Sequence, residues 1–180
     1  MADFNCDRQA KNDFTASTTA YLAEQGNPYR FDYYEQSVSG DLVPYGDADA
    51  STTAHTDIYM DYVTSAYTKR YAVEIKERIK YNSDAFQEWF YNIPKDRWLR
   101  AEEDAGYIPL FVNLYPDGVI DIWNLTKVDT DGVVVVPLKK VEINPDSPRV
   151  EQERLLLPSD KAKRIRRGKG KGNDRQKGDN

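Results

Sequence analysis

The sequence predicts an α/β fold in which a mixed central β-sheet is flanked by helices. Two observations carry this prediction. Apolar residues recur at helical spacing in segments that end at a glycine, and aromatic and β-branched residues alternate with polar ones in the segments between them. The chain has 180 residues, of which 39% are hydrophobic, enough for the core of one domain. We therefore expect one α/β domain at 1–158 and a tail at 159–180.

The first part of the chain is expected to form a helix followed by three strands. Apolar side chains recur at helical spacing through 10–25, and Gly26 supplies a stop signal. The segment 37–52 is rich in Gly, Pro, Ser and Asp, which predicts a loop. The strands are expected at 29–36, 55–63 and 69–79, where aromatic residues or alternating patterns occur.

The second part is expected to form a helical region and further strands. Ser83 is a capping signal before a segment with Phe86, Trp89 and Phe90 at helical spacing, which predicts a helix at 83–93. A second helical segment is expected at 95–106, ending at Gly106. The remaining strands are expected at 107–115 and 119–125, joined by a Pro-Asp-Gly turn, and at 132–143.

Composition limits the chemistry that is available. The chain has one cysteine and one histidine, which excludes an internal disulfide and argues against a metal site built from cysteines or histidines. Carboxylates would favour a hard ion such as Mg²⁺, with Mn²⁺ as a substitute. No apolar run approaches the roughly 20 residues of a membrane helix, and the N-terminus lacks a signal-peptide pattern. We therefore expect no membrane association and a reducing, cytoplasmic location.

The charge distribution sets the tail apart from the rest of the chain. Residues 159–180 carry nine Lys and Arg against three Asp, which leaves a net charge of −11 for residues 1–158 out of −5 in total. A segment this polar cannot bury enough apolar surface to offset the entropy cost of ordering. We therefore expect a disordered tail. Its cations would contact DNA; alternatively, the tail only promotes solubility. The candidate DNA-binding residues of the tail are Lys163, Arg164, Arg166 and Arg167.

Three polar side chains are expected to meet on the second and third strands. If these strands form a hairpin that turns at Ser65–Ala66, Asp57 faces Glu74 across the pair. A small shift of the turn would move Asp57 toward Lys76 instead. Two converging carboxylates repel one another unless a cation lies between them, and a divalent metal would supply that charge. Lys76 could then orient a water or stabilise charge on a phosphate.

The same residues resemble a known pattern. Asp57, followed after 16 residues by Glu74-Ile75-Lys76, resembles the PD-(D/E)xK nuclease superfamily, which includes restriction endonucleases, Holliday-junction resolvases and phage nucleases. The family core, ordered αβββαβ, matches the order expected here over about residues 10–125. The proline of the family name is absent, because Thr56 precedes Asp57, and Asp61 is the alternative ligand.

The resemblance implies roles for further residues. The metal would be held by Asp57, Glu74 and the carbonyl oxygen of Ile75. An acidic residue on the first helix often completes such a site, which favours Asp13 over Glu24. On the second helix the family often places a Lys, Gln or Arg that faces the site or the DNA. The candidates for that place are Lys95 and Gln87.

These features lead to one functional expectation and two alternatives. We expect a Mg²⁺-dependent DNA endonuclease, resolvase-like in size, in which Asp57, Glu74 and Lys76 are catalytic. The resemblance also implies a homodimer, an origin in a phage or mobile element, and replication or recombination proteins as partners. One alternative is a nuclease-fold protein that binds DNA or joins a larger assembly without cutting. The other is a structural or accessory protein that is anchored by the basic tail.

Overall fold

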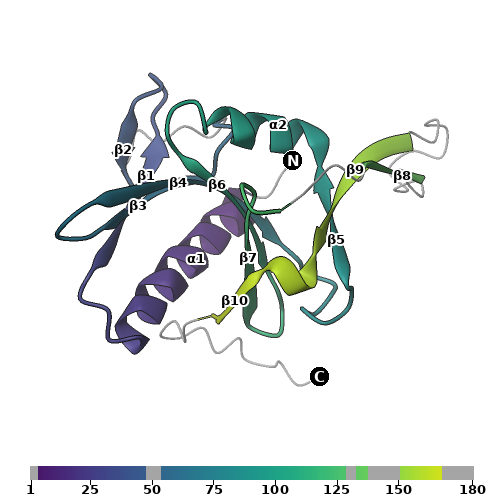
Figure 1. Cartoon of the computed structure of the whole chain (residues 1–180), viewed down its shortest axis with the longest axis horizontal. Helices are drawn as coiled ribbons and strands as arrows, with labels where there is room; N and C mark the ends of the chain where they lie inside the picture. Colours follow the sequence, from purple (N-terminus) through teal and green to yellow (C-terminus); the bar gives the residue numbers. More distant parts are fainter. Residues whose placement is uncertain (1–3, 48–53, 129–132, 138–150, 168–180) are drawn as a thin grey trace, which may run out of the picture.

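The computed structural model describes residues 4–47, 54–128, 133–137 and 151–167, which form two β-sheets and two α-helices (Figure 1). The helices are α1 (Phe4–Glu24) and α2 (Ile93–Ala101), with a short 3-10 helix at Ser159–Lys161. The strands are β1 (Arg30–Gln36), β2 (Leu42–Pro44), β3 (Ile58–Val63), β4 (Thr68–Glu77), β5 (Glu88–Asn92), β6 (Ile108–Leu114), β7 (Val119–Asn124), β8 (Val133–Pro137), β9 (Glu151–Pro158) and β10 (Lys163–Arg166).

The larger sheet is mixed and has the order β10-β7-β6-β4-β3-β1-β2. Strands β1, β3 and β4 lie side by side and antiparallel, whereas β6 runs parallel to β4. A parallel neighbour requires a crossover, and here β5 and α2 supply it between β4 and β6. The predicted α/β class with a mixed sheet is confirmed.

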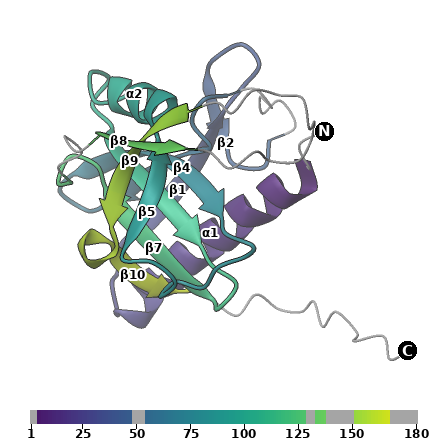
Figure 2. The ribbon, with the colours of Figure 1, turned by 90° about the vertical axis from the view of Figure 1, so that its right-hand side faces the viewer.

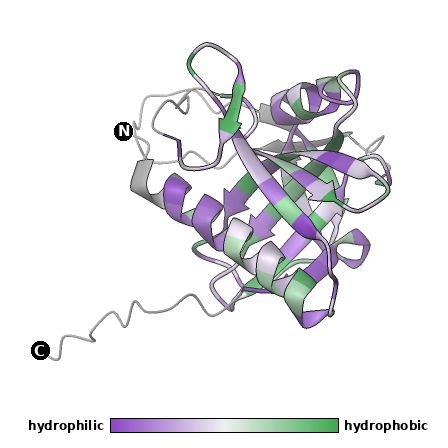
Figure 3. Cartoon of the chain, turned by 90° about the vertical axis from the view of Figure 1, so that its left-hand side faces the viewer, coloured by the Kyte–Doolittle hydropathy of each residue, from purple (hydrophilic) through white to green (hydrophobic). Residues whose placement is uncertain are grey.

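Two apolar clusters hold the layers together, one on each face of the large sheet. On one face α1 packs through Ala10 and Phe14 against side chains that include Val73 and Val112. On the other face α2 and the three-stranded sheet β5-β9-β8 cover Phe111 and its neighbours (Figure 2). The first half of α1 shows mainly hydrophilic residues on its outer side (Figure 3). The large sheet is therefore buried on both faces at its centre.

The alternation of side chains along the central strand β4 sets the face on which Glu74 and Lys76 lie. Val73 and Ile75 belong to the cluster under α1, whereas Ala72 belongs to the cluster on the opposite face. Because side chains alternate along a strand, Glu74 and Lys76 lie on the same face as Ala72, toward α2 and β5. The strand thus carries its carboxylate and ammonium into the space between the two sheets.

Several expected boundaries are wrong in the first half of the chain. Helix α1 begins at Phe4 rather than at residue 10. The segment predicted as a loop, 37–52, contains β2, which pairs with β1 through Tyr34 and Pro44. Proline is tolerated there because β2 is an edge strand.

The predicted helix at 83–93 is also wrong, because this segment contains β5. Trp89 and Tyr91 are buried, whereas Phe90 between them is 48% exposed. Burial thus alternates from one residue to the next, as in a β-strand. Pairing with β9 supplies the hydrogen bonds of this strand. Helix α2 begins only at Ile93, with Pro94 in its first turn, where a missing N–H costs nothing.

The expected disordered tail at 159–180 is wrong for its first part. Strand β10 pairs with β7 at the edge of the large sheet, with Ile165 opposite Ile120 and both side chains buried. The sheet therefore continues to Arg166, past the expected boundary at 158. Residues 168–180 of the expected tail lie outside the described residues. Of the strand expected at 132–143, residues 132 and 138–143 also lie outside them. In the described part, neither α-helix combines the length and the apolar character that crossing a bilayer requires.

Candidate active site and the adjoining basic pocket

The predicted hairpin register is confirmed. Val63 pairs with Thr68 and Ile58 with Val73, where the ladder ends. Just beyond it, the N–H of Asp57 donates to the carbonyl of Val73 at 3.0 Å, and Oδ2 of Asp57 accepts the N–H of Ile75 at 2.7 Å. The Asp57 carboxylate therefore takes the place of a ladder carbonyl and lies beside the backbone that joins Glu74 to Lys76.

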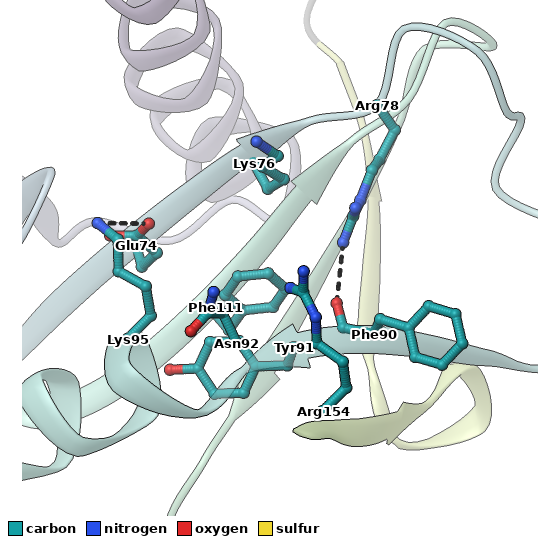
Figure 4. Close-up of a pocket in the computed structure, with 9 residues that line it drawn as sticks. All are labelled: Glu74, Lys76, Arg78, Phe90, Tyr91, Asn92, Lys95, Phe111 and Arg154. Atoms are coloured by element: carbon teal, nitrogen blue, oxygen red, sulfur yellow. Dashed lines mark hydrogen bonds and ion pairs between the residues drawn. The ribbon is translucent and has the colours of Figure 1, made fainter. Parts of the chain in front are cut away.

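Glu74 is paired with a lysine from the second helix. Nζ of Lys95 lies 2.9 and 3.0 Å from the two carboxylate oxygens of Glu74, which is only 9% exposed (Figure 4). The same ammonium lies 3.5 Å from the carbonyl oxygen of His55, two residues before Asp57. Lys95 thus joins the strand that carries Glu74 to the segment that leads into Asp57.

Asp57 forms an ion pair with a different lysine, which comes from a helix on the opposite face of the sheet. Nζ of Lys11 on α1 lies 3.9 Å from Oδ1 of Asp57 and 3.5 Å from the buried carboxylate of Glu35. Glu35 also accepts a hydrogen bond of 2.9 Å from Arg8. The carboxylates of Asp57 and Glu74 therefore each face an ammonium group from a different helix, and Asp57 is not among the side chains that line the pocket around Glu74.

Lys76 shares that pocket with Glu74 and is exposed. Its ammonium makes no hydrogen bond or ion pair with any residue that the structure describes, in contrast to Lys95 and Lys11. An ammonium without a protein partner is free to turn toward a bound anion, because its flexible stem allows several orientations.

Three oxygen donors lie near this point of β4. Asp57, just before β3, and Glu74 on β4 supply two carboxylates. The Ile75 carbonyl is on the Asp57 side of β4, because the N–H and C=O of one strand residue point the same way. One or two carboxylates are a usual Mg²⁺ set, since this ion keeps several waters. Within the described ranges, no three or more Asp, Glu, His or Cys side chains form a metal-binding group. These oxygen donors are of the kind that Mg²⁺ prefers, but each carboxylate faces a lysine, Lys95 for Glu74 and Lys11 for Asp57, that would have to make way for the ion.

Two other predicted ligands lie elsewhere. Asp13 pairs with Arg167 at 2.8 Å and accepts a hydrogen bond from Gln9, so it does not join Asp57 and Glu74. Asp61 pairs with Arg70 and Asp32 in the ladder, four residues along β3 from Asp57 and hence about 13 Å away. Burial raises the pKa of Asp61, with Asp32 adding to the effect and Arg70 opposing it.

The predicted DNA-binding residues separate into structural and exposed ones. Gln87 precedes β5 instead of lying on a helix, and its backbone carbonyl accepts the N–H of Ser159 at 2.8 Å. Arg164 forms two hydrogen bonds with Asp121, and Arg167 pairs with Asp13. The remaining two tail candidates, Lys163 and Arg166, have exposed side chains.

The pocket beside Glu74 also contains two arginines that were not among the predicted site residues. Its volume is about 190 Å³, and Arg78, just after β4, and Arg154 from β9 extend toward each other across it (Figure 4). Side chains alternate along a strand, so every second residue after Glu74 and Lys76 lies on the same side, and the next one is Arg78. The sequence therefore indicated that Arg78 lies near the site. No such signal exists for Arg154, because only the pairing of β9 with β5 brings it there.

Comparison with protein-family models, with curated proteins and with solved structures returned no match.

Proposed function

We propose that this chain is a divalent-metal-dependent nuclease that hydrolyses phosphodiester bonds in DNA, with a restriction endonuclease-like core. The observation that carries the proposal is the hydrogen bond from Ile75 to Asp57, which holds one carboxylate beside the strand that carries Glu74 and Lys76. The order of α1, β1, β3, β4, α2 and β6, with β6 parallel to β4, supports it. Helices on both faces of the sheet support it as well.

Each side chain has a defined role in this proposal. Asp57, Glu74 and the carbonyl of Ile75 would hold Mg²⁺ or Mn²⁺. When bound, such an ion neutralises charge on a phosphate and lowers the pKa of water. Lys76 donates to the phosphate and stabilises the negative charge that develops on its oxygens. Lys95 withdraws from Glu74 and remains close enough to bind the same phosphate.

The reaction itself is a hydrolysis that needs no further reactant. A water oxygen forms a bond to phosphorus while the bond from phosphorus to one sugar oxygen breaks. The water loses a proton, and the leaving oxygen gains one. Both charges change close to Lys76, which makes this ammonium the side chain on which the rate depends most.

The test is a cleavage assay with matched variants. Purified protein is incubated with supercoiled, linear and four-way-junction DNA in Mg²⁺, Mn²⁺ or EDTA. We expect cleavage only with metal, and a loss of at least about 100-fold in Glu74→Gln and Lys76→Ala. The controls remove the same charge at exposed positions: Glu24→Gln at the end of α1 and Lys69→Ala near the hairpin. Cleavage that persists in Glu74→Gln would overturn the proposal.

One observation favours a second candidate, a protein that binds DNA without cutting it. Both carboxylates already face lysines, Lys95 for Glu74 and Lys11 for Asp57, so the site is neutralised without a metal. In that case the protein binds DNA equally well in Mg²⁺ and EDTA and cuts none of the substrates. Calorimetric titration with Mn²⁺ separates the candidates, because only the nuclease binds the ion at a site that Glu74→Gln removes.

A further inference from the structure

The pocket beside the candidate active site is strongly basic. Among the described residues that line it are four cationic side chains and one carboxylate, that of Glu74, which Lys95 already pairs. The cationic residues are Lys76, Arg78, Lys95 and Arg154. Like charges repel, and they gather in a recess of a folded protein at a cost unless an anion joins them. Among the described lining residues, cationic side chains thus outnumber the carboxylate, although residues 1–158 are acidic overall.

Arg78 shows this imbalance most clearly. Its guanidinium donates to Oδ1 of Asn113 at 2.9 Å and to the carbonyl of Phe90 at 3.3 Å, and it lies 5.1 Å from the ring centroid of Trp89. None of these partners is an acid, and no described carboxylate lies within ion-pair distance. Burial lowers the pKa of Arg78, and Arg154 lowers it further. The side chain is thus fixed in place with its charge uncompensated.

A neighbouring hydroxyl also has unused hydrogen-bonding capacity. The hydroxyl of Tyr91, a residue only 1% exposed, is buried without a hydrogen-bond partner in the described part of the chain. Tyr91 lines the pocket. A buried polar atom without a partner is costly, so this hydroxyl is suited to an occupant that accepts a hydrogen bond. Burial raises the pKa of Tyr91, so its hydroxyl remains protonated and can donate.

We propose that this pocket is a subsite for one phosphate group of a nucleic acid strand, held by Arg78 and Arg154. A guanidinium binds two oxygens of a phosphate at once, which suits two arginines that approach from different segments, Arg78 after β4 and Arg154 on β9. Arg78 lies two residues after Lys76, just past the end of β4, about 7 Å away, and both side chains line the pocket. A nucleic acid strand with one phosphate at Lys76 therefore places a neighbouring phosphate at the part of the pocket lined by Arg78 and Arg154. Nucleic acid as the ligand rests on the proposed function, but binding in the subsite needs no metal.

Binding in EDTA tests this subsite independently of cleavage. A fluorescent oligonucleotide is titrated with the whole chain, and anisotropy is measured at several salt concentrations. We expect Arg154→Gln to weaken binding about tenfold and to reduce the slope of log K against log salt by about one, because one phosphate contact is lost. Lys69→Gln, which removes the same charge near the hairpin, should change affinity less than about twofold. Arg154→Lys should restore part of the affinity.

A second experiment changes the oligonucleotide instead of the protein. Replacing single phosphates by neutral methylphosphonates should reveal one position that matters in the wild type and no longer matters in Arg154→Gln. Oligonucleotides with and without a terminal phosphate then tell whether that position is internal or terminal. Equal losses in Arg154→Gln and Lys69→Gln, or no position that depends on Arg154, would overturn the subsite. A protein that fails to cleave DNA but passes this test retains the subsite and loses only the proposed catalysis.

Discussion

Lys95 lies against both carboxylate oxygens of Glu74, at 2.9 and 3.0 Å, so an ammonium group takes the place that a metal ion would need. The pair is only partly shielded from water, since the side chain of Lys95 is 35% exposed and that of Glu74 11%. Such a pair has modest strength, because solvent screens it. In the proposed nuclease, a divalent ion would displace Lys95 from Glu74.

We predict that Lys95→Ala strengthens binding of Mn²⁺ about fivefold, because the competing ion pair is worth about 1 kcal/mol at this exposure. Calorimetric titration measures the affinity directly. Glu74→Gln should abolish binding in the same assay. Unchanged affinity in Lys95→Ala would show that the ion, if it binds, does not use Glu74.

A second prediction concerns the dual role of Asp57. Asp57→Ala leaves the N–H of Ile75, a residue only 7% exposed, without its acceptor, and should lower the free energy of unfolding by about 1–3 kcal/mol. Asp57→Asn keeps an oxygen in the same place and should cost less than half as much, although it removes the negative charge that a metal needs. Urea denaturation compares the two variants. Equal losses would mean that the hydrogen bond contributes little.

The sequence held enough information to place Asp57 beside the Glu74–Lys76 segment. A short turn fixes the register of a hairpin, and a change of one residue would move every buried side chain of β3 to the wrong face. The roles of the two lysines that neutralise these carboxylates were harder to predict from the sequence. Lys95 was expected near the site but as a DNA contact, and Lys11 was not singled out, because its position depends on how α1 packs against the sheet.

Two strands escaped prediction for physical reasons. Phe86, Trp89 and Phe90 have a spacing that suits a helix, yet β5 follows the alternation of Trp89 and Tyr91, because pairing with the distant β9 decides its structure. Strand β10 buries only Ile165, too little to be recognised in a basic segment. Its stability comes from backbone pairing with β7, which no local pattern reveals.

A third prediction uses the pKa of Asp61, which burial raises and which Asp32 across the strand pair raises further. An acid with a raised pKa in the folded state destabilises the fold where it is ionised, and this penalty disappears as pH falls through the raised pKa to the ordinary value of 3.8. Asp61→Asn should therefore be about 0.5 kcal/mol more stable than the wild type at pH 7. Urea denaturation at pH 7 and pH 3 should show that this gain is absent at the lower pH. A gain that persists at pH 3 would point to a cause other than charge.

The strongest effect is expected at the residue that ties β10 to the sheet. Arg164 donates to both carboxylate oxygens of Asp121, at 2.7 and 2.8 Å, and Asp121 is completely buried. Arg164→Ala leaves that carboxylate without its cation and should lower the free energy of unfolding by about 3 kcal/mol. Adding Asp121→Asn should recover part of the loss, because the orphaned charge is then gone. Arg166→Ala, at an exposed site of the same strand, should change stability by less than about 0.5 kcal/mol. Equal, small effects of Arg164→Ala and Arg166→Ala in urea denaturation would instead return this segment to the role first expected of it, a solvated basic tail.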